Sequence, residues 1–493
     1  MVFACIATVL AFSPATNTLS RPHHALPVIS PARCTRAVLA DSAVDVDEAL
    51  LGSVLSVSSD GLIAVKPEDR ELAKVGTMLR FGGGGIGAII SERCGLYFAS
   101  SLEGPTPAAE EPAVLLPRNL TVPAWDGDAA SWGGLHDYLG RRVGGPAKSL
   151  AEEPDEGSPD VFGEPVPQAR RRPIGASLHT GVVALDALTP IGRGQSMMLF
   201  GPDALPAGAR RTDLALRILE GQHTLDSGIK CVLVLCEPDA AARQAAIDTL
   251  REAGALDTVK ILEATTPIEG ILAASAACSI AEACGSDDVL VVVDSLRPHL
   301  QMWRGICRSL SEANVPVSPE EEGSQQRQYY SRLVERASRR KEGAAGGGSV
   351  TLLLLQPSVS VLPSGNVRKE VYTLDDFEKG GFTKTVCSRV AMLVDKGIPI
   401  TQDVLVKVGI PLPGSDHPAA GKGQRSQQHL EELTSLVDGH IDLRENLASA
   451  GRLPPIDPSN SLTRIGVGST KLVSEQEATR TLLCSLSFSV FCL

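Results

Sequence analysis

The sequence of 493 residues is poor in aromatic side chains, has no surplus of basic residues, and lacks both C-x-x-C pairs and long apolar runs. Its formal net charge of −12 argues against a general nucleic-acid binder, which would present a basic face. Eleven scattered cysteines indicate neither a zinc site nor a disulfide scaffold. No apolar run reaches the ~20 residues that a membrane-spanning helix requires. The length allows two or three domains, each with its own core.

The most informative stretch is 178–216, which predicts a strand, a loop and a helix in that order. The apolar strand covers 196–200, and an amphipathic helix opens near Thr212. A strand that leads through a glycine-containing loop into a helix directs backbone N–H groups at phosphate. Pro202 and Pro206 lie in this loop, and each removes one N–H group that a phosphate would use.

The usual phosphate loop has two glycines five residues apart, followed by Lys and then Ser or Thr. Here Gly201 is the first glycine, Gly208 lies out of register, Arg211 stands where the lysine is expected, and Thr212 supplies the hydroxyl. Arginine binds phosphate through a planar fork, whereas lysine acts as a compact point charge. We therefore predict a phosphate loop in outline whose chemistry has changed, or else a helix start without a ligand.

Residues 181–195, GVVALDALTPIGRGQ, resemble the run that precedes the phosphate loop in alpha subunits of F-type rotary ATP synthases. Residues 436–469, LVDGHIDL to SLTRIGVGS, resemble a second specific run of the same subunit. YYSRLVERASR (329–339) and GGGSVTLLLL (346–355) resemble a helix and a strand that lie between these two runs. The chain is thus similar to a divergent member of the alpha/beta rotary ATPase family. This resemblance implies an α/β fold, with a RecA-like parallel-sheet nucleotide-binding domain behind a small N-terminal β-barrel.

The pattern before the central stretch agrees with such a barrel. Short strand-like runs are separated by Gly, Ser and Asp turns. They lie at 54–57, 62–65, 87–92 and 95–100. The run of four glycines at 82–85 is interpreted as a turn, because no helix follows it.

The expected organisation follows from these segments. It comprises a targeting leader at 1–40, the barrel at 46–116, a linker at 117–172, a nucleotide-binding domain at 173–470 with an insertion at about 356–432, and a short tail at 471–493. Within the linker, LGRRV (139–143) resembles a family strand that enters the nucleotide domain. Within the insertion, VAMLV (390–394) is strand-like.

The leader combines a short apolar core, FACIATVLAFSPA, with a tract rich in Ser, Pro, Arg and His that has no acidic residue. This order resembles the bipartite plastid-targeting leader of algae with complex plastids. A mitochondrial leader, an ordinary secretory signal and a disordered tail remain the alternatives.

A continuous apolar run at 230–235 and two further runs expected to be buried strands, at 260–264 and 289–293, alternate with helical segments, which predicts a doubly wound parallel sheet. The third run ends in Asp294. In NTPases of this class a Mg²⁺-associated acid ends a strand beside the phosphate-loop strand. Thr212 and Asp294 are therefore the candidate metal residues, acting through a bound nucleotide. For Asp294, capping of a turn is the alternative.

Two further residues are candidates through the resemblance. Glu237 follows the apolar run at 230–235, where catalytic subunits of the family have a glutamate that orients the attacking water and alpha subunits have glutamine. Its alternative role is helix capping at 237–239. Arg464, in SLTRIGVGS, matches the arginine that alpha subunits extend in trans into a neighbour's catalytic site. The alternative for Arg464 is a salt bridge within its loop.

The resulting hypothesis is an alpha-like, mostly non-catalytic nucleotide-binding subunit of an F-type proton-translocating ATP synthase. The resemblance implies ATP or ADP and Mg²⁺ as ligands and beta-type subunits as partners, with catalysis by this chain alone left open. A non-hydrolysing binding or assembly protein is the second hypothesis. A free-standing hexameric export-type ATPase ranks last, because it would need an intact phosphate loop.

Overall fold

The structure is a computed structural model that describes most of residues 49–463. Within that range it leaves out 59, 69–72, 126, 128–131, 146–148, 204, 226, 316–318, 342–346, 358–372, 375–376, 378–383, 396–399, 402–403, 406–407, 409 and 411–430. The predicted leader at 1–40, the tail at 471–493 and Arg464 lie outside the described residues.

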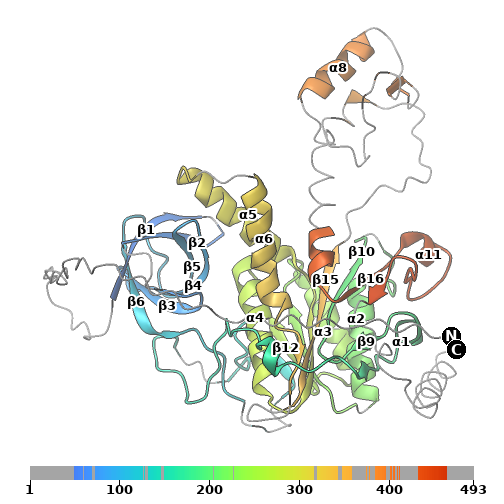
Figure 1. Ribbon diagram of the computed structural model, residues 1–493, viewed down its shortest axis with the longest axis horizontal. Coiled ribbons are helices and arrows are strands. Elements are labelled where there is room, and N and C mark those ends of the chain that lie inside the picture. Colours follow the sequence, from blue (N-terminus) through green and yellow to red (C-terminus); the bar gives the residue numbers. More distant parts are fainter. Residues whose placement is uncertain are drawn as a thin grey trace, which may run out of the picture. The chain divides into compact units, whose positions relative to one another are not determined.

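An antiparallel barrel forms the first part of the described chain (Figure 1). It closes in the order β1-β2-β5-β4-β3-β6. Its strands are β1 (Ala49–Val57), β2 (Leu62–Pro67), β3 (Thr77–Phe81), β4 (Ile86–Arg93), β5 (Leu96–Glu103) and β6 (Pro112–Asn119). Side chains alternate along each strand, so Ile63 and Val65 fill the barrel while Leu62 and Ala64 join the larger core outside it. The predicted barrel is confirmed, and the glycines at 82–85 form the turn between β3 and β4.

A mainly parallel sheet forms the nucleotide-binding domain, as predicted. Among the described residues it has nine strands in the order β17-β16-β10-β15-β13-β11-β12-β7, with β14 paired to β15. Only β14 and β17 run antiparallel to their neighbours. The strands are β7 (Gly134–His136), β10 (Ser196–Gly201), β11 (Lys230–Leu235), β12 (Val259–Glu263), β13 (Asp288–Val293), β14 (Ser338–Arg339), β15 (Ser349–Pro357), β16 (Gly439–Asp442) and β17 (Leu462–Thr463).

Helices cover both faces of this sheet (Figure 1). One face holds α4 (Pro267–Ala283), α5 (Arg297–Glu312) and α6 (Pro319–Val334); the other holds α2 (Arg211–Thr224) and α3 (Ala240–Glu252). In β11, Val232 and Val234 face the first group, whereas Cys231 and Leu233 face the second. Burial on both faces explains why these strands read as continuous apolar runs rather than alternating ones.

The segment 181–195, which resembles the alpha-subunit run, is held by hydrogen bonds of its own residues and of Thr180. Thr180 donates its backbone N–H and its hydroxyl to Asp186 Oδ1, at 2.9 and 2.8 Å. Asp186 lies in α1 (Val183–Leu188), which connects the short paired strands β8 (Ser177–Leu178) and β9 (Ile191–Gly192). Gln195 accepts from Gly192 N and donates to Thr463 on β17. These contacts fix how the chain enters β10.

Two segments differ from the sequence-based expectation. The segment 139–143 is a turn rather than a strand, because the Asp137 carboxylate accepts the N–H groups of Leu139 and Arg141. The strand, β7, comes three residues earlier and pairs with β12, so the predicted linker contributes to the sheet. In the insertion, 390–394 belongs to the helix α8 (Lys384–Asp395).

The insertion forms a helix because its buried apolar residues recur at helical spacing. Val386 and Val390, four residues apart, are buried in a small cluster with Phe377 and Ile400.

The helix expected at 329–339 ends earlier than predicted, since α6 stops at Val334 and 338–339 form β14. Pro238 precedes α3, whose N-cap is Asp239.

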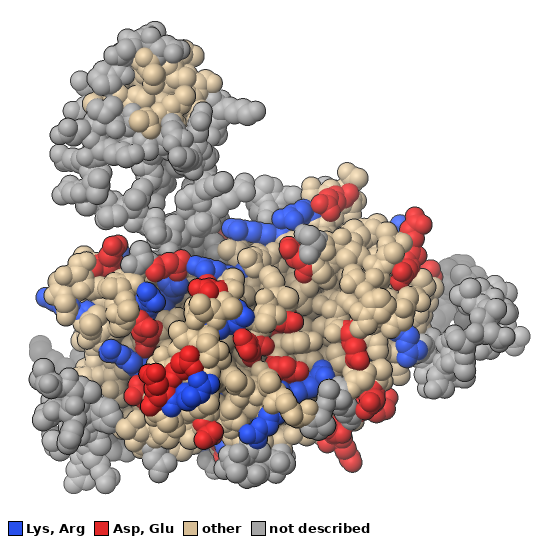
Figure 2. Space-filling view, turned by 180° about the vertical axis from the view of Figure 1, so that it is seen from behind, with Lys and Arg blue, Asp and Glu red and all other residues tan. Residues whose placement is uncertain are grey.

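Acidic and basic side chains lie interspersed on the face of the protein that Figure 2 shows. The buried Cys231, Cys236, Cys278 and Cys284 are free thiols that pack in the core. Among the helices that the structure describes, none is both long enough and apolar enough to cross a membrane.

A buried histidine–lysine pair connects β7 to β12. Lys260 Nζ lies 3.0 Å from His136 Nε2, and His136 Nδ1 lies 2.9 Å from Gly134 O. The ammonium donates to Nε2, so Nδ1 carries the proton and donates to the carbonyl. Burial and the nearby Lys260 charge lower the pKa of His136 to about 4. The pair therefore requires a neutral imidazole.

Acidification should weaken the fold through this pair. The unfolded histidine, with its ordinary pKa near 6.5, takes up a proton before the folded one does, so stability is complete above pH ~6.5 and is lost toward pH ~4. We expect His136→Gln, which keeps an acceptor for Lys260, to remove up to ~3 kcal/mol of that loss. Urea unfolding at several pH values measures it. An unchanged pH slope in the variant would show that His136 is not the titrating group.

Close packing of α2 gives a second prediction. A Cβ at Gly221 would lie 2.3 Å from the Thr180 carbonyl oxygen, whereas at Gly305 it would meet only the flexible end of Leu62 at 3.3 Å. In a helix interior, alanine is usually more stabilising than glycine by ~1 kcal/mol. We expect Gly221→Ala to destabilise the fold by ~1–3 kcal/mol instead, through overpacking. Gly305→Ala is the matched control, and equal melting temperatures for the two variants would contradict this account.

Candidate functional site

The candidate site is the loop that joins β10 to α2 at the carboxyl edge of the sheet. Gly201 ends β10, and a Cβ there would lie 2.8 Å from Leu443 Cβ. Gly208 has a φ of +82°, a backbone conformation that favours glycine. Packing at position 201 and backbone conformation at position 208 therefore each explain why glycine is present, without a ligand. Thr212 lies half-buried in the first turn of α2.

A carboxylate of the helix occupies the N–H donors of the loop. Asp213 Oδ2 accepts from Gly208 N at 2.7 Å and from Arg210 N at 3.0 Å. An acidic residue in the first helical turn is stabilised by the unpaired N–H groups and by the helix dipole. A phosphate bound to these two N–H groups would have to displace Asp213.

The Arg211 guanidinium also donates its hydrogen bonds to groups within the chain. It donates to Gly201 O and, at 2.6 Å, to Asp203 Oδ1. Its Nε is buried and has no hydrogen-bond partner within the described part of the chain. Asp203 Oδ2 accepts from Arg297 at 2.6 Å, and Arg297 also donates to Glu237 Oε1 at 2.5 Å. Four charged side chains thus form one alternating series, Arg211–Asp203–Arg297–Glu237.

Asp294 is connected to this series through the backbone of Glu237. The strand that it follows, β13, is separated from β10 by β15, so it is one strand further from the phosphate loop than expected. Its Oδ1 accepts from Cys236 N at 2.8 Å and Oδ2 accepts from Glu237 N at 3.2 Å. Burial raises its pKa to about 6. The carboxylate thus caps the turn after β11, which was the alternative interpretation, and its metal role stays a prediction.

The structure gathers most of the predicted site residues at one edge. Gly201, Arg211, Glu237 and Asp294 are connected by the contacts above. Three residues that the sequence analysis did not single out complete them: Asp203, Asp213 and Arg297. Asp213 could have been found from its place three residues after the N-cap. Asp203 and Arg297 carry no comparable signal, because they are 94 positions apart.

No group of three or more His, Cys, Asp or Glu side chains suited to a metal occurs in the part of the chain that the structure describes. A Mg²⁺ ion at this site would depend on a nucleotide for its remaining ligands. The phosphates of that nucleotide would first have to displace Asp203 and Asp213.

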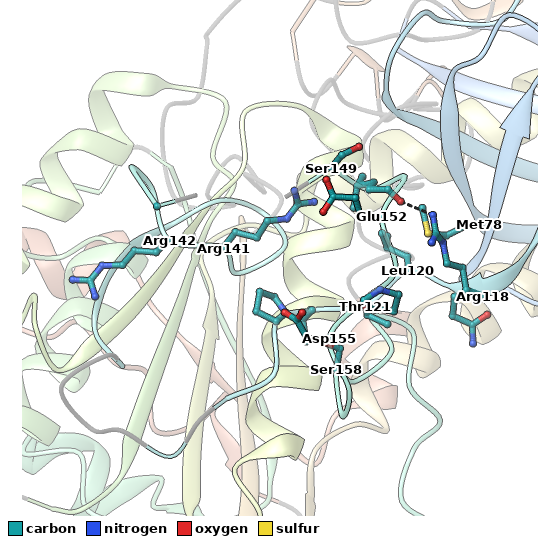
Figure 3. Close-up of a pocket in the computed structure, with 16 residues that line it drawn as sticks. Met78, Arg118, Leu120, Thr121, Arg141, Arg142, Ser149, Glu152, Asp155 and Ser158 are labelled. Atoms are coloured by element: carbon teal, nitrogen blue, oxygen red, sulfur yellow. Dashed lines mark hydrogen bonds between the residues drawn. The ribbon is translucent and has the colours of Figure 1, made fainter. Parts of the chain in front are cut away.

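A separate pocket of about 550 Å³ lies away from the loop (Figure 3). Its walls come from the barrel end and from the segments after it, including Met78, Arg118, Arg141 and Asp155. Arg118 donates to the carbonyl oxygens of Leu150 and Ala151. The pocket shares no lining residue with the phosphate-loop site.

A parallel sheet with a phosphate-type loop at its carboxyl edge, preceded by a closed barrel, defines an α/β nucleotide-binding domain of the ATPase type. Residues 181–365 match the model of the ATP synthase alpha/beta family, nucleotide-binding domain. Over these residues the chain is similar to that family, and the relatives below are alpha subunits.

Three relatives illustrate the similarity. ATP synthase subunit alpha of Caldanaerobacter subterraneus subsp. tengcongensis is 28% identical over 273 residues, or 54% of this chain and 50% of the relative. ATP synthase subunit alpha 1 of Legionella pneumophila (strain Paris) is 32% identical over 40% of this chain and 38% of the relative. ATP synthase subunit alpha of Acetivibrio thermocellus is 32% identical over 28% and 27%, respectively. The chain therefore spans half of the length of the first relative and less of the others.

The Asp213 contacts predict a local effect of mutation. We expect Asp213→Ala to expose the Gly208 and Arg210 N–H groups to exchange and to cost about 1 kcal/mol, because capping carboxylates contribute about that much. Hydrogen exchange followed by mass spectrometry resolves the effect. Asp239→Ala, which removes the cap of α3, is the control and should leave exchange at 208–210 unchanged. Unaltered exchange there in Asp213→Ala would show that these bonds are not maintained in solution.

Proposed function

We propose that the chain is an alpha-like, non-hydrolysing nucleotide-binding subunit that works with beta-type subunits of an F-type, proton-translocating ATP synthase. The family domain at 181–365 and the alpha-subunit relatives support the class. The charge series at the carboxyl edge supports the loss of hydrolysis.

The single observation that carries the proposal is the engagement of Glu237 by Arg297 at 2.5 Å. Hydrolysis of a phosphoanhydride needs a side chain that orients water and a cation that neutralises the transferred phosphoryl group. The glutamate at the water-orienting position is held by an arginine, and the Arg211 cation is held by Asp203. Both requirements are unmet while this series of ion pairs persists, so the loop is degenerate in its chemistry.

Other parts of the proposal concern residues outside these contacts. A bound ATP or ADP would bring Mg²⁺ toward Thr212 and Asp294, and the ion would neutralise phosphate charge. Arg464 would act in trans, in the catalytic site of a neighbouring beta-type subunit. The leader would direct the protein to a plastid, with mitochondrial or secretory routing as alternatives.

The second candidate is a binding or assembly protein that keeps the fold and no longer binds nucleotide. The two loop N–H groups taken by Asp213 favour it. A free-standing export-type ATPase is the least supported, since its turnover would depend on the phosphate loop itself.

Reconstitution with a beta-type subunit separates these candidates. We expect a hetero-oligomer by light scattering, with ATP hydrolysis that is absent from either chain alone. Arg464→Ala should lower that hydrolysis by roughly 10³-fold or more, as expected for an arginine that stabilises the transferred phosphoryl group. Arg452→Ala, at an exposed arginine twelve positions earlier in the sequence, is the matched control.

Two results would contradict the proposal. Turnover by the chain alone that Glu237→Gln abolishes would indicate an independent ATPase. A stable complex with no nucleotide bound at millimolar concentration would favour the assembly protein.

A further inference from the structure

We propose that Arg211 and Arg297 form a two-arginine anion site whose resident ligand is the Asp203 carboxylate, and that a polyphosphate group binds by displacing it. Asp203 then sets the affinity of the loop for phosphate. The natural ligand rests on the proposed nucleotide-binding function, but the anion site itself does not.

The geometry is that of a bridged anion. Each Asp203 oxygen accepts from a different guanidinium, both at 2.6 Å. The two arginines begin different helices, α2 and α5, and both contact Asp203 in the loop that joins β10 to α2. Two planar forks that share one anion match the oxygens of a phosphate group as well as those of a carboxylate.

The resident carboxylate is the most accessible member of the series. The Asp203 side chain is 56% exposed, compared with 12% for Arg211 and 34% for Arg297. An exposed ion pair gains little over its hydration, so a tethered carboxylate at this position can be exchanged for a stronger anion. A terminal phosphate group carries more charge than a carboxylate and has three acceptor oxygens.

The buried arginine has unused capacity. The Arg211 Nε has no partner among the described residues, although its side chain is largely enclosed. A buried donor without an acceptor is unfavourable. A phosphate group offers more acceptors than Asp203, which accepts from Arg211 Nη2 alone while Nη1 donates to Gly201 O, so the exchange can satisfy Nε as well.

Arg297 also couples the anion site to Glu237. While Asp203 is in place, Arg297 is shared between two carboxylates. Phosphate in place of Asp203 leaves Arg297 in contact with both the ligand and Glu237. The site is thus built to hold an anion and keeps Glu237 neutralised while it does so.

The test compares Asp203→Asn with the wild-type full-length chain. Inorganic tripolyphosphate and ATP are titrated separately by isothermal calorimetry, without Mg²⁺. If the tethered carboxylate occupies the arginines nine times in ten, its removal should tighten the apparent Kd for tripolyphosphate by about 10-fold. Adding Arg297→Gln to Asp203→Asn should abolish the gain.

Asp239→Asn is the matched control, because it removes one negative charge at the same sheet edge while asparagine still caps α3. An Asp203→Asn gain no larger than that of Asp239→Asn overturns the inference, as does absence of tripolyphosphate binding to both the wild type and Asp203→Asn. Asp203→Ser replaces Asp203→Asn if the latter does not give the wild-type melting temperature.

The two ligands separate this inference from the proposed function. A gain for tripolyphosphate without any ATP binding supports the anion site and removes nucleotide as its natural ligand. ATP binding to the wild type that Asp203→Asn leaves unchanged supports nucleotide binding and overturns the role of Asp203.

Discussion

At the carboxyl edge of the sheet, N–H groups and guanidinium groups converge on a loop, and each needs an acceptor. This protein supplies the acceptors from its own side chains: Asp213 for the loop N–H groups and Asp203 for the arginines. The N-terminus of a helix concentrates positive potential and the guanidinium groups carry positive charge, which an anion balances. Because Asp203 and Asp213 supply that negative charge, they determine which groups of the site are paired with one another.

The internal anions also explain how a divergent loop can remain folded. Pro202 and Pro206 remove two donors, and Gly201 is required by its contact with Leu443 rather than by a ligand. Asp294 holds the turn after β11 through Cys236 and Glu237. Asp203, Asp213 and Asp294 each accept hydrogen bonds from groups of the chain itself, and these bonds stabilise the loop and the turn after β11.

Much of the fold was predictable, because burial on two faces gives a continuous apolar run and burial on one face gives an alternating one. The strands β10, β11 and β13 were recognised as apolar runs, and the barrel runs at 54–57 and 87–92 were recognised as short segments between Gly, Ser and Asp turns. The errors have local causes. Asp137 competes for the backbone at 139–143, and Val386 and Val390 follow a helical period that a five-residue window conceals. The position of β15 between β10 and β13 depends on crossovers that no local pattern encodes.

The sequence by itself determined the family resemblance and the order of barrel and parallel sheet. It predicted Gly201, Arg211 and Asp294 as site residues from local spacing, the direction of parallel strands and the resemblance, and Glu237 from the resemblance alone. Only the tertiary structure decided what those residues contact. Asp203 and Arg297 are 94 positions apart, and Arg297 and Glu237 are 60 positions apart. Such ion pairs arise because separate strand ends share one edge of a sheet, and that proximity depends on the topology rather than on any neighbouring residue.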